Sequence, residues 1–291
     1  MSLGFARCYT YSIMLETILL LPPYFVSIVA FVLGVIIGSF LNVYIYRFHT
    51  GKSLTGSSHC LSCRTPLRFY ELFPLFSYLG LRGRCRSCSA IIPSRYFWVE
   101  LVTGVLFLLT VNVALDIKLW PLLFVLMATL VVVAVYDLAH FVIPNAFVWS
   151  LSLIAVLYVG YDVFLTQDYF GIIWNVLAAT LAFSFFASLW WYSGGRWIGF
   201  GDAKLAVPLA FMVGIMGVFS MLTLSFWIGT IISVSILGWQ KYGKGGQLGF
   251  RLGGRPLTIK SEVPFAPFLI LGFLTVFLFR VDVLVWFSYA L

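Results

Sequence analysis

Two aspartates have the clearest potential for chemistry in this chain, which contains only 10 Asp and Glu among 291 residues. Asp137 ends an apolar run, and Asp202 lies in the segment GFGDAK at 199–204. A carboxylate at a membrane boundary is costly, and chains that keep one usually use it. Two carboxylates that converge can share one proton and activate a water molecule. The pair therefore predicts the hydrolytic chemistry of an aspartic protease.

Three residues beside Asp202 complete a predicted active-site loop. Gly199 and Gly201 have no side chains, so an extended substrate backbone can lie close to Asp202 and hydrogen-bond to the loop. Lys204 is expected to face phosphate headgroups. Taken alone, either aspartate is typical of a boundary residue solvated by headgroups. Their position on the same side of the membrane, with one inside a GxGD segment, favours catalysis.

The two aspartates are expected at opposite kinds of helix end. Asp137 would lie at the C-terminal end of the third membrane span, and Asp202 at the start of the sixth. The negative end of a helix dipole disfavours an ionised carboxylate, whereas free N–H groups at a helix start stabilise one. We therefore expect Asp137 to be the protonated partner, which polarises the scissile carbonyl, and Asp202 to be the base that deprotonates water.

Four cysteines form a second chemical motif, CxxC-x21-CxxC, at Cys60, Cys63, Cys85 and Cys88. Each CxxC turn directs two thiolates to one point, and two such turns complete a tetrahedral zinc site. The alternative is two disulfides, but thiols stay reduced on the cytoplasmic side, where the basic character of this segment places it. With all four positions filled by cysteine, the predicted zinc ion is structural, because it folds a segment too small to hold a core alone.

The composition indicates a polytopic membrane protein. The chain is 62% hydrophobic and only 10% charged, whereas soluble domains carry about a quarter charged residues. Apolar runs long enough to span a bilayer, or nearly so, predict an all-α protein with about eight transmembrane helices. They lie at 24–46, 96–115, 119–136, 147–161, 170–192, 203–217, 218–239 and 264–279.

The net charge of +8 is better explained by membrane topology than by nucleic acid as a partner. Most Lys and Arg residues fall in loops that share one side when the spans alternate, and most aspartates fall on the other side. This positive-inside bias predicts a membrane protein in contact with the lipid bilayer, with both termini outside. Asp137 and Asp202 then both face the cytoplasm.

Three regions are expected along the chain. Residues 1–47 hold a short interfacial segment and the first span, residues 48–95 form the cytoplasmic four-cysteine zinc domain, and residues 96–291 form the peptidase core. The Gly-rich stretch 240–262 is expected to be a cytoplasmic linker. Cys8, the remaining cysteine, is expected to be inert.

The ordered motifs resemble those of bacterial type IV prepilin peptidases. They are GSFLNVYIYR at 38–47, the paired CxxC turns with PLFS at 74–77 and RGRC at 82–85, YD at 136–137 with IP at 143–144, GFGDAK at 199–204, and PFAPF at 264–268. Together they cover most of the chain. A lone GxGD would be a weak signal, whereas the ordered set is highly specific.

The resemblance implies an intramembrane aspartic endopeptidase of the bacterial cytoplasmic (inner) membrane. It would remove the short basic leader of type IV prepilins or pseudopilins, serving type IV pili or type II secretion. Asp137 and Asp202 match the two catalytic aspartates of the family. Many members also methylate the new amino terminus with S-adenosylmethionine, an activity associated with the cysteine loop, where Glu71 and Gly83 are the candidate residues.

Two segments depart from the family pattern. Leu72-Phe73 replaces the frequent Asn-Ile before Pro74, which bears on methylation. Asn145 replaces a frequent Asp and is not expected to affect cleavage. The chain has no Gly-rich Rossmann fingerprint, so a site for the methyl donor must be built in another way.

Three other functions fit parts of the sequence. A presenilin-like or signal-peptide-peptidase-like protease would share the YD and GxGD motifs, but not the four-cysteine loop. A proton-coupled transporter would use paired acids as a relay, but would place them within the spans. A zinc-stabilised membrane scaffold would not need Asp137.

Overall fold

The computed structural model describes residues 22–48, 58–60, 62–114, 116–242, 251–252, 255–256 and 263–285. The interfacial segment expected at 13–21, Cys8 and most of the predicted linker at 240–262 lie outside these residues.

The described chain is built from helices, as the apolar runs predict. Those long enough to cross a membrane are α2 (Pro23–Arg47), α4 (Arg95–Val113), α5 (Trp120–His140), α6 (Asn145–Thr166), α7 (Gly171–Ser193) and α8 (Phe200–Tyr242). A shorter apolar helix, α9, covers Ala266–Phe279. The remaining elements are small: η1 (Phe69–Leu72), α3 (Phe76–Gly80), η2 (Ile117–Leu119), and the paired two-residue strands β1 (Arg251–Leu252) and β2 (Arg255–Pro256).

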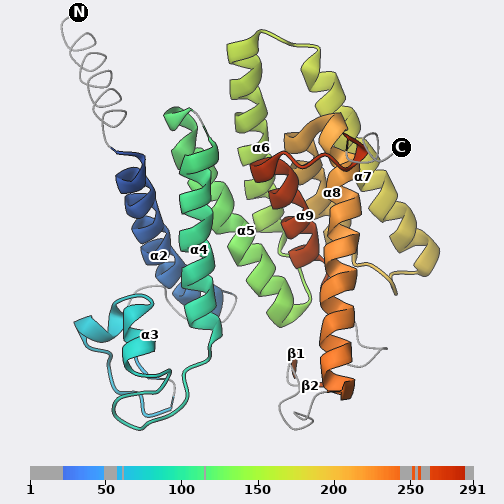
Figure 1. The fold of residues 1–291 in the computed structure, drawn as a ribbon. Helices are drawn as coiled ribbons and strands as arrows, with labels where there is room; N and C mark the ends of the chain where they lie inside the picture. Colours follow the sequence, from blue (N-terminus) through green and yellow to red (C-terminus); the bar gives the residue numbers. More distant parts are fainter. Residues whose placement is uncertain are drawn as a thin grey trace, which may run out of the picture. The chain divides into compact units, whose positions relative to one another are not determined.

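The predicted sixth and seventh spans form the single element α8, which is interrupted at Gly214. The backbone there is non-helical, with φ 70° and ψ −176°, a conformation that glycine adopts without a Cβ penalty. Aromatic rings of α7 contact both Phe200, in the first part of α8, and Phe226, in the second part. Both parts of α8 therefore pack alongside α7, and the second part runs back in the opposite direction. The chain therefore reverses at Gly214 (Figure 1), three residues before the expected junction at 217–218.

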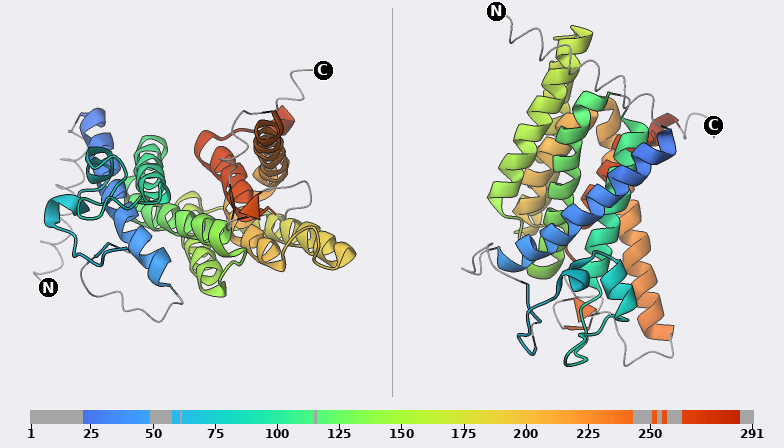
Figure 2. Two further views of the ribbon diagram at one scale, coloured as in Figure 1. Left: turned by 90° about the horizontal axis from the view of Figure 1, so that it is seen from below. Right: turned by 90° about the vertical axis from the view of Figure 1, so that its left-hand side faces the viewer.

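Two compact units divide the chain, 1–131 and 132–291, with the boundary inside α5. In the first unit, α2 and α4 pack side by side (Figures 1 and 2). Glycines make this close approach possible. A Cβ on Gly34 would lie 2.7 Å from the carbonyl oxygen of Thr103, and one on Gly38 would lie 2.8 Å from the Cα of Glu100. Small residues spaced four apart are typical of such helix contacts in membranes.

The second unit has an aromatic core. The rings of Phe186, Phe226 and Phe265 lie 5.0–6.4 Å apart between centroids. The second part of α8 packs on α9 through Gly272, whose added Cβ would lie 2.1 Å from the Ser225 hydroxyl. The ring contacts of Phe265, the residue directly before α9, fix the start of this helix.

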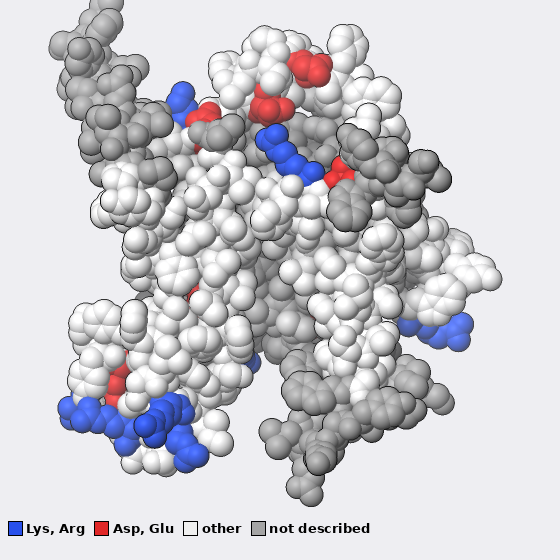
Figure 3. All heavy atoms as spheres, in the orientation of Figure 1, with Lys and Arg blue, Asp and Glu red and all other residues white. Residues whose placement is uncertain are grey.

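Basic and acidic side chains are grouped at different parts of the chain. Lys and Arg side chains gather on the segment between α2 and α4 (Figure 3), which carries Arg64, Arg68, Arg82, Arg84 and Arg86. In the second unit, Asp162 near the end of α6 and Asp168 in the α6–α7 turn lie at one end of the helices, while Arg196 in the α7–α8 connection and Lys204 near the start of α8 lie at the other.

Candidate active site and cysteine cluster

Asp137 lies in the last turn of α5, where it is buried with 5% of its surface exposed. Its carboxylate accepts a hydrogen bond from the backbone N–H of Ala266, the first residue of α9. Among the described residues, its Oδ2 is a buried oxygen without a hydrogen-bond partner. A buried polar atom left in this way is costly, so it marks a position where a proton, a water molecule or a substrate can bind.

Asp202 lies in the first turn of α8 and is 7% exposed. Its carboxylate accepts a hydrogen bond from the backbone N–H of Gly199, and it interacts electrostatically with Asp137. Both aspartates belong to the second unit. The structure thus brings together two carboxylates that are 65 positions apart in sequence.

The surroundings of the two aspartates are more alike than their helix ends predict. Asp137 lies near the C-terminal end of α5, as expected, but it also faces the N-terminus of α9 through Ala266. A helix start stabilises negative charge, so α9 opposes the effect of α5. The assignment of the protonated partner to Asp137 therefore stays a prediction.

The loop around Asp202 docks on the turn between α5 and α6. A Cβ on Gly201 would lie 3.4 Å from Ile143, and one on Gly199 would lie 3.5 Å from Oδ2 of Asp202. The Lys204 ammonium donates to Oδ1 of Asn145 over 3.2 Å and lies 5.1 Å from the centre of the Phe200 ring. Lys204 therefore links the start of α8 to the start of α6.

This arrangement can do one kind of chemistry directly. Two buried, interacting carboxylates cannot both ionise easily, so they can hold one shared proton. One can then accept a proton from water while the other donates to a carbonyl oxygen. Ala266 lies within the PFAPF motif but contributes through its backbone N–H, so the residue types of the motif did not predict this contact with Asp137.

The four cysteines of the motif converge in the first unit. All are free thiols, and their sulfur atoms lie within 4.8 Å of one another. Cys60 Sγ and Cys88 Sγ are 3.8 Å apart. A tetrahedral zinc site with bonds of about 2.3 Å also places its sulfurs roughly 3.8 Å apart. The four thiols are free in this structure, and their cluster fits a zinc ion.

The two CxxC turns have the same backbone geometry. In the first, the N–H of Cys60 donates to Thr65 and that of Arg64 donates back to Cys60; in the second, Cys85, Ala90 and Ser89 repeat the pattern. Arg64 and Ser89 both have positive φ. The Thr65 side chain and backbone lower the pKa of the Cys63 thiol from 9.0 to about 6, whereas burial and the neighbouring cysteine thiols raise the pKa of Cys88 to about 11.

Glu71 and Gly83 have identifiable structural roles beside this cluster. Glu71 Oε2 accepts from the N–H of Arg68 over 2.7 Å and so caps η1. Gly83 has φ 66°, and a Cβ there would lie 2.9 Å from the hydroxyl of Tyr78. Glu71 and Tyr78 line a cavity in the first unit, whereas Gly83 only supports Tyr78.

The sequence matches two family models in the order of the fold. Residues 32–114 match the bacterial peptidase A24 N-terminal domain, and residues 124–234 match the type IV leader peptidase family. The chain is 34% identical over 220 residues to the "Type 4 prepilin-like proteins leader peptide-processing enzyme" of Escherichia coli, covering 66% of this chain and 78% of that protein. The chain belongs to the type IV leader peptidase family.

Two further family members show the same likeness. The "Prepilin leader peptidase/N-methyltransferase" of Bacillus subtilis is 30% identical over 254 residues, covering 86% of this chain and 93% of that protein. A relative of the same name from Myxococcus xanthus is 43% identical over 129 residues, which cover 43% of this chain and only 38% of the relative. No solved structure matches the chain. The family and the six long apolar helices among the described residues together make this a multi-pass membrane protein.

Proposed function

We propose that this protein is an intramembrane aspartic endopeptidase that removes the leader of type IV prepilins or pseudopilins and then methylates the new amino terminus. The observation that carries the peptidase activity is the pair of buried, interacting carboxylates of Asp137 and Asp202. The names of the relatives support the substrate and the second activity.

In the proposed cleavage, the two aspartates act as a unit. One carboxylate takes a proton from water, whose oxygen attacks the scissile carbonyl, while the other donates its proton to the carbonyl oxygen. The N–H groups of Ala266 and Gly199 orient the two carboxylates. Gly199, Gly201 and Lys204 are the proposed active-site loop, which receives the extended segment of the leader. The cut then frees a new amino terminus.

The cysteine cluster supports this function structurally. Zinc held by Cys60, Cys63, Cys85 and Cys88 would close the two turns onto each other, and with four thiolates it has no open position for catalysis. S-adenosylmethionine supplies a methyl group on positively charged sulfur, which an amine can accept with loss of a proton. Glu71 and Gly83 are the residues proposed for methylation from the family resemblance.

The proposed location is the bacterial inner membrane, with the site on the cytoplasmic side. The basic segment between α2 and α4 supports this orientation. In inverted inner-membrane vesicles, an added protease should cut this segment, and it should be protected in intact spheroplasts. Cutting only in spheroplasts would reverse the proposed orientation.

The peptidase is tested with protein purified in detergent and a purified prepilin. Mass spectrometry of the products should show loss of the leader by the wild type, and a further gain of one methyl group when S-adenosylmethionine is present. Asp137→Asn and Asp202→Asn should each abolish leader loss, whereas the matched changes Asp162→Asn and Asp168→Asn should not. Cleavage by either Asp137→Asn or Asp202→Asn at the wild-type rate would exclude the dyad.

A further inference from the structure

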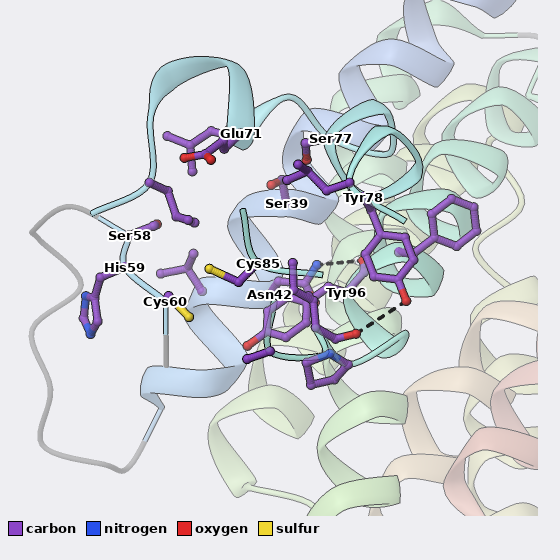
Figure 4. Close-up of a pocket in the computed structure, with 18 of the residues that line it drawn as sticks. Ser39, Asn42, Ser58, His59, Cys60, Glu71, Ser77, Tyr78, Cys85 and Tyr96 are labelled. Carbon is purple, nitrogen blue, oxygen red and sulfur yellow. Dashed lines mark hydrogen bonds between the residues drawn. The ribbon is translucent and has the colours of Figure 1, made fainter. Parts of the chain in front are cut away.

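The first unit contains a cavity between the ends of α2 and α4 and the cysteine segment. Its volume is about 670 Å³, within the range of about 300–1,000 Å³ that is typical of small-molecule sites. Figure 4 shows side chains from all three parts around it. Aromatic and apolar side chains form much of the wall, including Tyr46, Tyr78, Tyr96 and Phe97.

One polar feature of this wall is a buried carboxylate, that of Glu100 in α4. Glu100 is 8% exposed. Its carboxylate accepts from the N–H of Leu75 over 2.8 Å and from the side chains of Ser39 and Asn42. Asn42 is held in turn by the carbonyl of Tyr96, at 3.0 Å (Figure 4). These groups fix the carboxylate in place.

The groups that hold Glu100 are neutral. An N–H, a hydroxyl and an amide orient a carboxylate, but they do not supply the positive charge that a buried anion needs for full compensation. A ligand with a positive charge that entered the cavity would supply it. The cavity wall also carries Arg47 and Arg86, so it offers a carboxylate to a positive group of a ligand and guanidinium groups to a negative one.

The backbone gives an independent sign of a built site. Leu75 has φ 59° and ψ −52°, which a residue with a branched side chain rarely adopts and which costs about 1–3 kcal/mol. In this conformation its N–H points to Glu100. Such strain is typically found at binding and catalytic sites.

We propose that this cavity binds the methyl donor, S-adenosylmethionine, and that Glu100 faces a positively charged group of it. The inference rests on the proposed methyl transfer. The donor carries a sulfonium and an ammonium group, which need a carboxylate, and an adenine ring, which stacks on aromatic side chains. Glu100 lies on a membrane helix outside the cysteine segment, so the donor site combines both parts of the first unit.

The proposal also gives Glu71 and Gly83 different roles. Glu71 is partly exposed, with Oε2 bound to the Arg68 N–H, so it lines the cavity from the end of η1. Gly83 does not line the cavity and affects it through the position of Tyr78. Glu100 is therefore the carboxylate that recognises charge.

The test measures donor binding as well as activity. Isothermal titration calorimetry of the full chain in detergent gives the dissociation constant for S-adenosylmethionine. Glu100→Gln keeps the shape and an oxygen that accepts from Leu75 but removes the charge, so we expect affinity to fall about 10- to 100-fold. Prepilin cleavage, measured on the same sample, should stay at the wild-type rate, which shows that the variant is folded. Asp162→Asn is the matched control and should bind as the wild type.

A second variant tests the cavity without changing charge. Ser77 lines the cavity, so Ser77→Trp should fill it. It should weaken binding of S-adenosylmethionine and of the product S-adenosylhomocysteine, which lacks the sulfonium charge, alike. Wild-type affinity in either Glu100→Gln or Ser77→Trp would overturn the inference while leaving methyl transfer intact. A wild-type protein that cleaves but neither binds nor uses S-adenosylmethionine would instead refute the proposed methylation itself.

Discussion

The aspartate pair and the cysteine segment are held in place by different means. Asp137 and Asp202 lie at the ends of long apolar helices, inside a unit packed with aromatic side chains. In the described residues of the cysteine segment, 58–94, only Gly83 and Cys85 are buried, and Phe69 and Phe76 are more than three quarters exposed. A segment without a core needs a cross-link, whereas packed helices position the aspartates without one. The two proposed activities should therefore be separable.

The largest effect should follow removal of the metal. Cys63→Ser removes a ligand, and we expect bound zinc to fall from about one per chain to none and methylation to be lost, because the segment then lacks its cross-link. Prepilin cleavage should persist. Zinc is measured by atomic absorption and both activities by product mass. Cys8→Ser, which changes a cysteine outside the CxxC motif, is the control and should keep its zinc.

If Cys63→Ser lost cleavage as completely as methylation, the aspartate pair would depend on the cysteine segment. The separation between the two regions would then be wrong.

The glycine contact between α2 and α4 should give the next largest effect. A Cβ on Gly38 would lie 2.8 Å from the Cα of Glu100, so Gly38→Ala must push the helices apart at a cost of about 1–3 kcal/mol. We expect a lower melting temperature and weaker methylation. Gly160→Ala is the matched control, because nothing lies within 4 Å of an added Cβ there. Equal melting temperatures for the two variants would contradict the packing described.

Gly83→Ala should act more locally. The substitution combines positive φ with a contact of 2.9 Å to the Tyr78 hydroxyl, so Tyr78 must move and methylation should fall about tenfold. Cleavage should not change. Gly80→Ala, with open space around its added Cβ, should keep full methylation. Equal methylation by the two variants would show that Tyr78 is not needed.

The smallest effect is expected at the active-site loop. A Cβ on Gly199 would lie 3.5 Å from Oδ2 of Asp202, an ordinary contact, and the N–H donor to Asp202 remains. We expect Gly199→Ala to slow cleavage by less than about fivefold, measured from initial rates, with methylation of a pre-cleaved substrate unchanged. Gly238→Ala, which adds a Cβ in open space, serves as the control. A complete loss of cleavage would mean that the loop needs more room than this contact indicates.

The sequence predicted those features that have a local signal. Apolar runs predicted the helices, and the CxxC spacing predicted the sulfur cluster, because each turn orients its own two thiols. The reversal in α8 was placed at 217–218 instead of Gly214, since several glycines interrupt this apolar run and only the packed structure distinguishes them.

Other features depend on contacts between distant segments. The meeting of Asp137 with Asp202 could be expected only from the ordered motifs, because 65 residues separate them. The N–H of Ala266 belongs to the backbone, which the sequence cannot single out. Glu100 was not recognised because a single acid in an apolar helix gives no sign of the loop that folds over it.

The central claim is that Asp137 and Asp202 form one hydrolytic unit. It is tested most directly by single-turnover cleavage rates of Asp137→Asn, Asp202→Asn and the double variant. Residues that act together lose activity non-additively, so each single change should slow cleavage by roughly 10⁴-fold or more and the double change no further. Losses that multiply in the double variant, or a single variant that still cleaves efficiently, would contradict a shared-proton dyad.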